Sequence, residues 1–218
     1  MLICGIDEAG RGPMIGPLVI CGVLINEKDG PKLRKIGVTD SKLLTPKQRE
    51  QLFNKIINTV KKYKIIIVEP REIDDALSSD DLNLNWLEAL KTAQIINDLK
   101  PKKAILDAPS TNIKSYLEYI KKLLNVSVEI IAEHKADLNH PTVAAASILA
   151  KVTRDREIEK IQKKIGKRFG SGYPSDPETV RFAEKHHSDY PAIFRKTWAS
   201  YKKIMEKKFQ STLDSFSP

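Results

Sequence analysis

Apolar residues along this chain fall into two kinds of stretch. The first kind is short and rich in isoleucine, leucine and valine, which is typical of strands buried in a sheet. Such runs occupy residues 2–7, 18–25, 65–68, 103–107 and 126–132. A segment rich in glycine and proline, residues 10–17, joins the first two runs and predicts an antiparallel hairpin.

The second kind of stretch is longer and repeats its apolar residues at helical spacing. The clearest helix start is Thr45-Pro46-Lys47-Gln48, a capping box with proline in the first helical position. Further helices are predicted at about residues 84–99, 113–124, 141–164, 176–187 and 193–208. Because strands alternate with helices after an initial hairpin, we expect an α/β fold in which helices flank a five-stranded mixed sheet.

The length and composition suit one domain with an appendage. The chain has 218 residues, of which 41% are hydrophobic, and this is enough to bury a full core. We expect the sheet and its flanking helices in residues 1–165 and a C-terminal helical extension in residues 166–208. Residues 209–218 are expected to form a flexible tail.

The charge balance favours a polyanionic partner. Lysine and arginine number 37 against 28 acidic residues, which gives a formal net charge of +9. Nucleic acid is the leading candidate, and an anionic membrane surface comes second. The alternative is a lysine-rich surface that faces only solvent.

Cysteine usage and hydropathy indicate a cytoplasmic protein without a membrane partner. Cys4 and Cys21 lie in predicted strands and have no C-x-x-C spacing, so we expect buried free thiols in a reducing compartment. The N-terminus lacks the basic region and cleavage site of a secretory leader. No apolar stretch approaches the roughly 20 residues of a transmembrane helix.

Four acidic residues follow predicted strands. Asp7 and Asp107 each end an apolar run, Glu8 comes directly after Asp7, and Asp137 follows the fifth run. If the first and fourth strands are parallel neighbours, these acids meet at the edge where open α/β sheets bind ligands. Such a cluster could hold two divalent cations about 4 Å apart and hydrolyse a phosphodiester. The alternative is that each acid only caps a helix or forms a turn.

A glycine loop, Gly10-Arg11-Gly12, follows the first pair of acids. It leads into a strand rather than a helix, which argues against a dinucleotide-binding fingerprint, and the sequence has no P-loop. Glycines let a backbone approach a ligand closely, and Arg11 could donate to a phosphate. The alternative is a plain hairpin turn.

Six sequence blocks, in order from the N-terminus to about Trp198, resemble the pattern of type 2 ribonuclease H (ribonuclease HII), most closely its archaeal branch. They are residues 5–13, 40–43, 107, 134–137, 144–151 and 170–176. The resemblance implies a ribonuclease H-like fold and an endoribonuclease that hydrolyses the RNA strand of RNA–DNA hybrids. It also implies cleavage at ribonucleotides embedded in duplex DNA, by a two-metal-ion mechanism that leaves 3′-OH and 5′-phosphate ends.

The resemblance also assigns roles to individual residues. It implies that the catalytic metal ligands are the four acids Asp7, Glu8, Asp107 and Asp137, holding two Mg²⁺ or Mn²⁺ ions. The residues expected to bind substrate are Gly10, Arg11, Gly12, Lys42, Tyr173, Arg195 and Lys196. In the family, the glycine loop and the tyrosine sense the 2′-OH at an RNA–DNA junction, the group that distinguishes RNA from DNA. The basic side chains are expected to contact phosphates.

The C-terminal tail resembles the clamp-binding box of replication and repair proteins. Gln210, Leu213 and Phe216 have its spacing, and one short turn would bring Leu213 and Phe216 to the same side as anchors for an apolar groove. Ser217 stands where a second aromatic residue is usual. We therefore expect a monomer that binds a sliding clamp; the alternative is a frayed terminus.

Two other functions are compatible with these patterns. A different nuclease of the same fold, such as a junction resolvase, would use similar acids, and a non-catalytic hybrid-binding protein would need only a basic surface. The histidines have no zinc-binding spacing. His134 lies close to Asp137 in its block and could support it.

Overall fold

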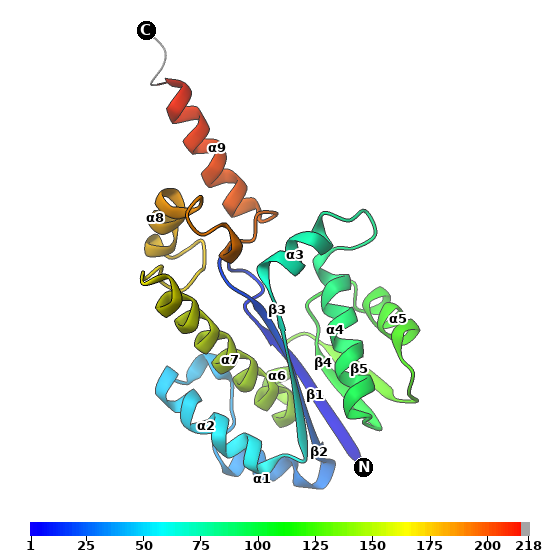
Figure 1. Cartoon of the computed structure of the whole chain (residues 1–218). Coiled ribbons are helices and arrows are strands. Elements are labelled where there is room, and N and C mark those ends of the chain that lie inside the picture. Colours follow the sequence, from blue (N-terminus) through cyan, green and yellow to red (C-terminus); the bar gives the residue numbers. More distant parts are fainter. Residues whose placement is uncertain (215–218) are drawn as a thin grey trace.

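The structure is a computed structural model that describes the backbone of residues 1–214 and the side chains of residues 1–207. Its centre is a five-stranded sheet with the strand order β3-β2-β1-β4-β5 (Figure 1). The strands are β1 (Leu2–Ala9), β2 (Leu18–Asn26), β3 (Lys62–Val68), β4 (Lys103–Asp107) and β5 (Glu129–Glu133). β1, β2 and β3 pair in antiparallel fashion, whereas β1, β4 and β5 are parallel. The predicted mixed sheet and its first hairpin are confirmed.

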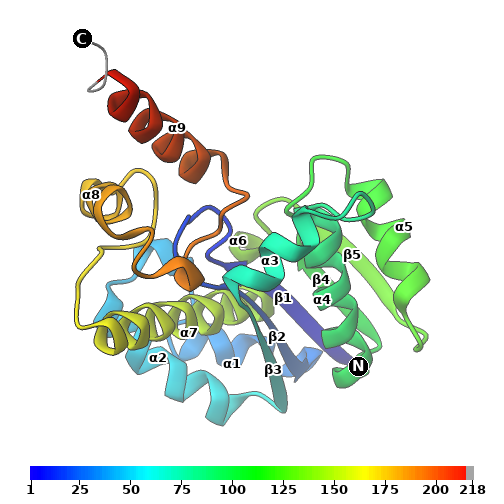
Figure 2. The same ribbon diagram turned by 45° about the horizontal axis from the view of Figure 1, so that its top comes forward.

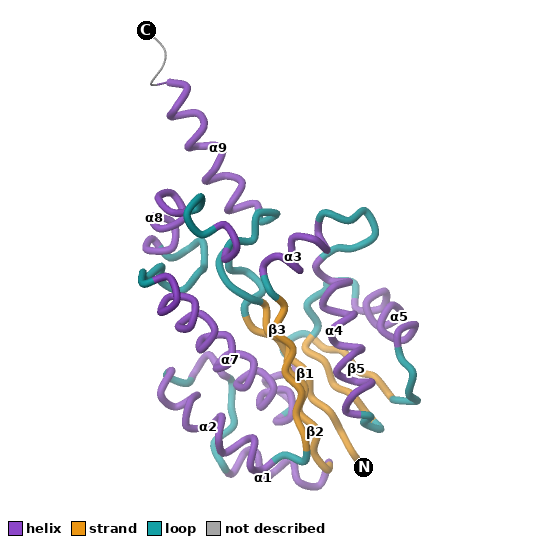
Figure 3. The backbone as a smooth tube through the Cα atoms, viewed as in Figure 1, coloured by secondary structure: helices purple, strands orange, loops and turns teal. Residues whose placement is uncertain are grey.

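Helices cover both faces of the sheet (Figure 3). On one face lie α4 (Leu84–Leu99) and α5 (Ile113–Leu123); on the other lie α1 (Gly30–Lys35), α2 (Pro46–Thr59) and α7 (Pro141–Ile165). Each face of the sheet packs against its helices in an apolar core. Alternate residues of β1 belong to one core or the other, because neighbouring side chains of a strand point to opposite faces. Cys4 and Ile6 pack with α4 and α5, and Ile3 packs with α2 and α7.

The contact between α7 and β1 is close because both elements carry small residues there. A Cβ atom on Gly5 would lie 2.3 Å from the Thr142 carbonyl carbon and 2.4 Å from the Val143 nitrogen. The alanines at positions 144–146 of α7 are buried against the sheet. These residues set the distance between β1 and α7, and with it the position of the segment that leads into α7.

The C-terminal region forms a third apolar cluster around the turn of the first hairpin. α8 (Pro177–His186) and the beginning of α9 (Ala199–Asp214) enclose a set of aromatic side chains. Met14 and Ile15, from the turn between β1 and β2, are buried in the same cluster. The expected helical extension is therefore tied to the first hairpin, and α9 extends away from the body (Figure 2).

Several element boundaries differ from the prediction. β1 continues to Ala9 instead of ending at Asp7, and β3 begins at Lys62 instead of residue 65. α9 begins at Ala199 rather than at residue 193, because Asp74 of α3 (Pro70–Leu77) accepts the N–H groups of Lys196 and Thr197 and takes them from a helix. α9 then continues to Asp214, so residues 209–214, which we expected in the flexible tail, are helical. β5 is shorter than expected because its partner β4 begins at Lys103, which pairs with the first residue of β5.

Local sequence signals were most reliable for the longer elements. The capping box is confirmed: the Thr45 side chain accepts the Gln48 N–H, and the Gln48 side chain accepts the Thr45 N–H. The short helices α1, α3 and α6 (Ala136–Asn139) were not predicted, because so few residues show no clear apolar period.

Both cysteines are buried and free, as expected. Among the helices of residues 1–214, none has the length and apolar character needed to span a membrane.

Candidate active site

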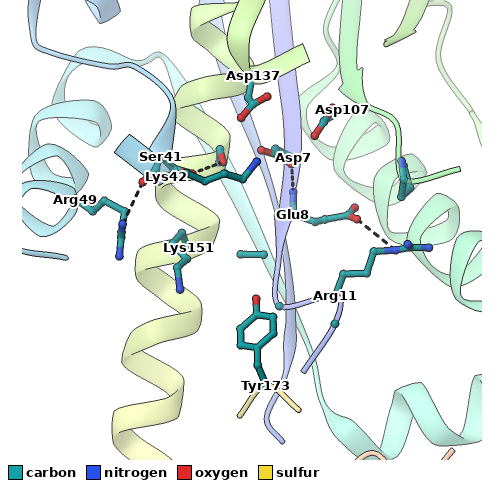
Figure 4. A pocket seen from close by; sticks show the side chains of 15 residues that line it. Asp7, Glu8, Arg11, Ser41, Lys42, Arg49, Asp107, Asp137, Lys151 and Tyr173 are labelled. Atoms are coloured by element: carbon teal, nitrogen blue, oxygen red, sulfur yellow. Dashed lines mark hydrogen bonds and ion pairs between the residues drawn. The ribbon is translucent and has the colours of Figure 1, made fainter. Parts of the chain in front are cut away.

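Three aspartates meet at the carboxyl edge of the sheet. Asp7 of β1 and Asp107 of β4 are neighbours because the two strands are parallel and in register. Asp137 comes from α6, and the Asp107 carboxylate accepts a 3.0 Å hydrogen bond from the Ala136 N–H, which fixes α6 at this edge. Figure 4 shows the three aspartates facing the same space. The predicted parallel pairing and the convergence of these acids are therefore present in the structure.

Glu8 lines the same pocket, but its carboxylate is turned away from the aspartates (Figure 4). Its Oε1 lies 3.7 Å from Nε of Arg11, and its backbone N–H donates to Asp7 Oδ1 at 2.7 Å. In the part of the chain that the structure describes, no three acidic, histidine or cysteine side chains are close enough to hold a metal ion. The four acids share one pocket, with Glu8 oriented differently from the other three.

Burial and repulsion between neighbouring carboxylates raise the pKa values of Asp7, Glu8 and Asp107. Asp7 is only 7% exposed, and burial together with the charges of Asp107 and Asp137 raises its pKa to about 7. A hydrogen bond with Ser147 opposes this rise. Burial, reinforced by neighbouring acids, also raises the pKa of Glu8 and of Asp107. A divalent cation would relieve the repulsion, and carboxylate oxygens suit Mg²⁺ or Mn²⁺, so the residues fit such a metal.

The glycine loop and Tyr173 line the pocket on the side away from Asp137 (Figure 4). Gly10 has φ +85°, and a Cβ there would lie 2.7 Å from the Pro17 carbonyl oxygen, so only glycine fits. A Cβ on Gly12 would lie 3.6 Å from Cε1 of Tyr173, which places the ring against the loop. The loop and the ring therefore form one wall of the pocket.

Lys42 reaches the acids from a 3-10 turn, Ser41–Leu43. The Asp40 carboxylate accepts the Lys42 N–H at 2.9 Å and starts this turn. Ser41 Oγ lies 3.1 Å from Ser147 Oγ, which joins the turn to α7. Figure 4 shows the Lys42 side chain directed toward Asp7. Its ammonium group is therefore well placed for an anionic ligand beside the acids.

Several pocket residues were absent from the predicted site: Ser41, Arg49, Ser147 and Lys151. Ser147 and Lys151 lie one turn apart on α7 within a matched block, and this spacing was the available signal. Arg49 is buried and donates to the carbonyl oxygens of Ser41 and Leu44. Its partners are set by tertiary packing, so no local pattern identifies its role.

The side chain of Arg11 is bound by α4. Its Nε donates to Glu88 Oε1 at 2.8 Å, and its Nη2 donates to Asn85 Oδ1 at 2.6 Å. Glu88 is fully buried. Two nitrogens of this guanidinium therefore already have partners on α4, and the expected donation from Arg11 to a phosphate stays a prediction. The signal for Glu88 was an acid among the apolar positions of the predicted helix.

Arg195 and Lys196 are not brought into the pocket. Arg195 is fully buried and donates to backbone carbonyl oxygens, so the prediction that it contacts phosphate is wrong for this arrangement. Lys196 is exposed but lines a separate depression with Arg71 and Asp74.

The predicted clamp-binding residues fall at or beyond the limit of the described side chains. Gln210 and Leu213 belong to the end of α9, where the structure does not describe side chains, and Phe216 lies outside the described residues. His134 lies with Nδ1 3.2 Å from the Ala108 carbonyl oxygen, so its ring contacts the loop that follows β4.

Known proteins share this sequence and fold. The family model of ribonuclease HII matches residues 4–201. Ribonuclease HII of Pyrococcus furiosus is 50% identical over 225 residues, which cover 99% of this chain and 98% of the relative. The crystal structure of the ribonuclease H2 from Pyrococcus horikoshii OT3 has a TM-score of 0.87 and 47% identity, and the match covers 96% of this chain and 100% of that chain.

A second solved structure is the PCNA:RNase HII complex from Archaeoglobus fulgidus, with a TM-score of 0.82 and 38% identity. That match covers 91% of this chain and 95% of the other. The matches extend over nearly the whole length of each protein, and the residues matched by the family model span the positions of all four acids. The chain therefore belongs to the ribonuclease HII family and is a metal-dependent endoribonuclease that acts on RNA–DNA hybrids.

Proposed function

We propose that the pocket at the carboxyl edge of the sheet hydrolyses the phosphodiester at a ribonucleotide, both in hybrids and in DNA duplexes with embedded ribonucleotides. The observation that carries this proposal is the convergence of three aspartates, of which Asp7 and Asp137 are buried, beside the glycine loop and Tyr173. One wall is suited to binding cations, and the other is suited to close contact with a sugar. The products are expected to carry 3′-OH and 5′-phosphate ends.

The metal ligands in this proposal are Asp7, Glu8, Asp107 and Asp137, which would hold two Mg²⁺ or Mn²⁺ ions. When bound, such ions supply an activated water and stabilise the leaving oxygen of the phosphodiester. Glu8 would turn from Arg11 toward the aspartates; its 3.7 Å contact with Nε of Arg11 is longer than a hydrogen bond. The hydrogen bond from Ala136 would keep Asp107 in place during the reaction.

The remaining pocket residues would position the substrate. Lys42, directed toward Asp7, would contact the phosphate next to the cleaved bond. The backbone of the glycine loop and the ring of Tyr173 would hold the sugar of the ribonucleotide between them. All of these groups come from one chain, which supports a monomeric enzyme.

The C-terminal tail is proposed to bind a sliding clamp through Gln210, Leu213 and Phe216. The Archaeoglobus relative has been solved as a complex with PCNA, and α9 leads the chain away from the catalytic pocket (Figure 1). A cytoplasmic location is proposed as well, supported by the buried and unpaired thiols of Cys4 and Cys21.

The test of the catalytic proposal is cleavage of a DNA duplex that contains one ribonucleotide, with Mg²⁺ or Mn²⁺. We expect the wild type to cut at that position and to leave an all-DNA duplex intact. Asp7→Asn should lower the rate at least about 100-fold, because a ligand charge at the reacting phosphate is lost. The matched control Asp75→Asn changes an exposed acid of α3 and should cut at the wild-type rate.

Three results would contradict the proposal. Cutting of the all-DNA duplex would favour a junction resolvase or another nuclease of the same fold. Binding of the hybrid without cleavage, in either metal, would favour a non-catalytic binder. Full cleavage by Asp7→Asn would refute the assignment of the metal ligands.

A further inference from the structure

The C-terminal segment, residues 195–198, binds every carbonyl oxygen of the glycine loop. Arg195 Nη2 donates to the Gly10 carbonyl at 2.7 Å, and Nη1 donates to the Arg11 carbonyl at 3.0 Å. The indole Nε1 of Trp198 donates to the Gly12 carbonyl at 3.2 Å. Two side chains of one short segment therefore satisfy three successive carbonyl groups that lie more than 180 residues earlier in the chain.

Arg195 is a buried support of this turn rather than a surface cation. Besides the loop carbonyls, it binds the Gly16 carbonyl through Nε at 2.9 Å, at the other end of the same turn. Its guanidinium lies 4.8 Å from the centroid of the Trp198 ring. Burial lowers the pKa of Arg195 to about 9, so it is still a cation at neutral pH. The planar fork of an arginine suits several carbonyl acceptors at once.

The segment is itself held by the rest of the fold. The Asp74 carboxylate accepts the N–H groups of Lys196 at 2.8 Å and of Thr197 at 2.9 Å, and it also accepts the Thr197 hydroxyl. The Arg195 N–H donates to the Met14 carbonyl at 2.9 Å. α3 and the first hairpin therefore hold the segment in place against the loop.

The two contacts of Arg195 with the loop carbonyls determine where the N–H groups of the loop point. In a trans peptide unit the carbonyl oxygen and the following N–H point in opposite directions, and residues 1–214 contain no cis peptide bond. Because Arg195 holds the Gly10 and Arg11 carbonyls, the N–H groups of Arg11 and Gly12 are directed away from it. Neither N–H has a hydrogen-bond partner within the described residues, and both residues line the pocket.

We propose that Arg195 and Trp198 are positioning residues for ribonucleotide recognition: Arg195 orients the Arg11 and Gly12 N–H groups to donate to a sugar 2′ oxygen in the pocket, and Trp198 holds the end of the loop through the Gly12–Pro13 peptide, which has no N–H of its own. The proposal rests on the function proposed above. A ribose offers this acceptor and a deoxyribose does not. A continuous hybrid offers a 2′-OH at every position of its RNA strand. Cleavage of the hybrid therefore depends less on recognising the 2′-OH of one particular sugar.

The sharpest variant is Trp198→Phe, which removes the indole donor and leaves an aromatic ring beside Arg195. We expect kcat/KM on a duplex with one embedded ribonucleotide to fall about tenfold, as for the loss of one hydrogen bond. On a continuous RNA–DNA hybrid the fall should be much smaller, so the ratio of the two values changes. Trp86→Phe, which shortens a half-buried indole on α4, is the matched control and should leave the ratio unchanged.

Arg195→Gln separates positioning from phosphate binding. A phosphate contact contributes about one unit to the slope of log affinity against log salt concentration, whereas a buried positioning residue contributes none. We expect Arg195→Gln to keep the wild-type slope while lowering the ratio of kcat/KM on the embedded ribonucleotide to kcat/KM on the continuous hybrid. Lys42→Gln, at the proposed phosphate contact, should reduce the slope. If Arg195→Gln does not fold, the Trp198→Phe ratio decides the question.

An unchanged ratio in Trp198→Phe would overturn the proposal, as would a reduced salt slope in Arg195→Gln that matches Lys42→Gln. A wild-type protein that cuts neither substrate would instead refute the proposed function. The two failures are therefore distinguishable in one set of assays.

Discussion

Asp7 shows how the properties of one side chain depend on residues far away in the chain. Its position at the end of β1 follows from the local apolar pattern. Its raised pKa, about 7, comes from burial and then from Asp107 and Asp137, which reach it only in the folded state. Arg195 depends on distant residues as well. The sequence around it suggests a free surface cation, but in the fold its partners are carbonyl oxygens of the first hairpin turn.

Asp176 carries a residue-scale prediction about stability and pH. Its carboxylate accepts the Ser171 N–H at 2.7 Å and the Glu178 N–H at 2.9 Å, and these bonds hold its pKa below the 3.8 that is usual for an aspartate. A carboxyl group with a lowered pKa in the folded state stabilises the fold above its unfolded pKa. That stability is lost as the pH falls through the folded pKa.

Asp176→Asn should therefore lower the free energy of unfolding by about 1 kcal/mol at pH 7, as for a weakened helix cap. The difference from wild type should shrink as the pH falls below 3.8. Urea denaturation at pH 7 and at acid pH measures both values, and Asp75→Asn on the exposed face of α3 is the control. If the difference in free energy of unfolding between the two proteins does not change with pH, the ionised carboxylate of Asp176 is not the source of the stability.

At the scale of elements, local signals and tertiary contacts share control of the boundaries. The capping box predicts the start of α2, because capping involves only neighbouring backbone groups. The start of α9 could not be predicted, because Asp74, more than 120 residues earlier, takes the N–H groups that a helix would need. The length of β5 likewise depends on where its partner strand begins.

The contact between β1 and α7 gives an element-scale prediction. A Cβ on Gly5 would meet the backbone of Thr142 and Val143 at 2.3 and 2.4 Å, and this backbone cannot rotate away as a side chain could. Gly5→Ala should push α7 from β1 and lower the free energy of unfolding by roughly 3 kcal/mol. Because α6 leads into α7, cleavage should fall as well.

The matched control is Gly30→Ala at the start of α1. Its backbone is right-handed helical, and an added Cβ would meet no atom within 4 Å. Alanine there should be neutral or stabilise the fold by up to about 1 kcal/mol. Thermal and urea denaturation of both variants, with cleavage assays, test the prediction; equal effects of the two changes would refute it.

At the scale of the whole molecule, the pocket is assembled from most of the chain. The acids come from the sheet and α6, Lys42 from the turn before α2, and Tyr173 from the C-terminal region. That region is bound to the hairpin turn through Met14 and Ile15, so it supports the glycine loop and the pocket together.

Deleting residues 210–218 should abolish clamp binding and spare cleavage of the duplex with one ribonucleotide, because the pocket lies in the body of the protein. Surface plasmon resonance with an archaeal PCNA ring measures the first effect, and the cleavage assay measures the second. Removal of residues 217–218 alone is the control and should preserve binding. If the variant that lacks residues 210–218 binds the clamp as fully as the variant that lacks only residues 217–218, the clamp contact lies elsewhere in the chain.

The sequence by itself determined the alternation of strands and helices, the first hairpin and the presence of acids at strand ends. These features follow from short-range periodicity and capping, which depend on neighbouring residues. Only the tertiary structure decided that Glu88 and Asn85 hold Arg11, and that Arg195 binds carbonyl oxygens rather than phosphate. The reason is physical: burial and hydrogen-bond partners are set by segments that come into contact only in the folded chain, and the local sequence does not show which segments these are.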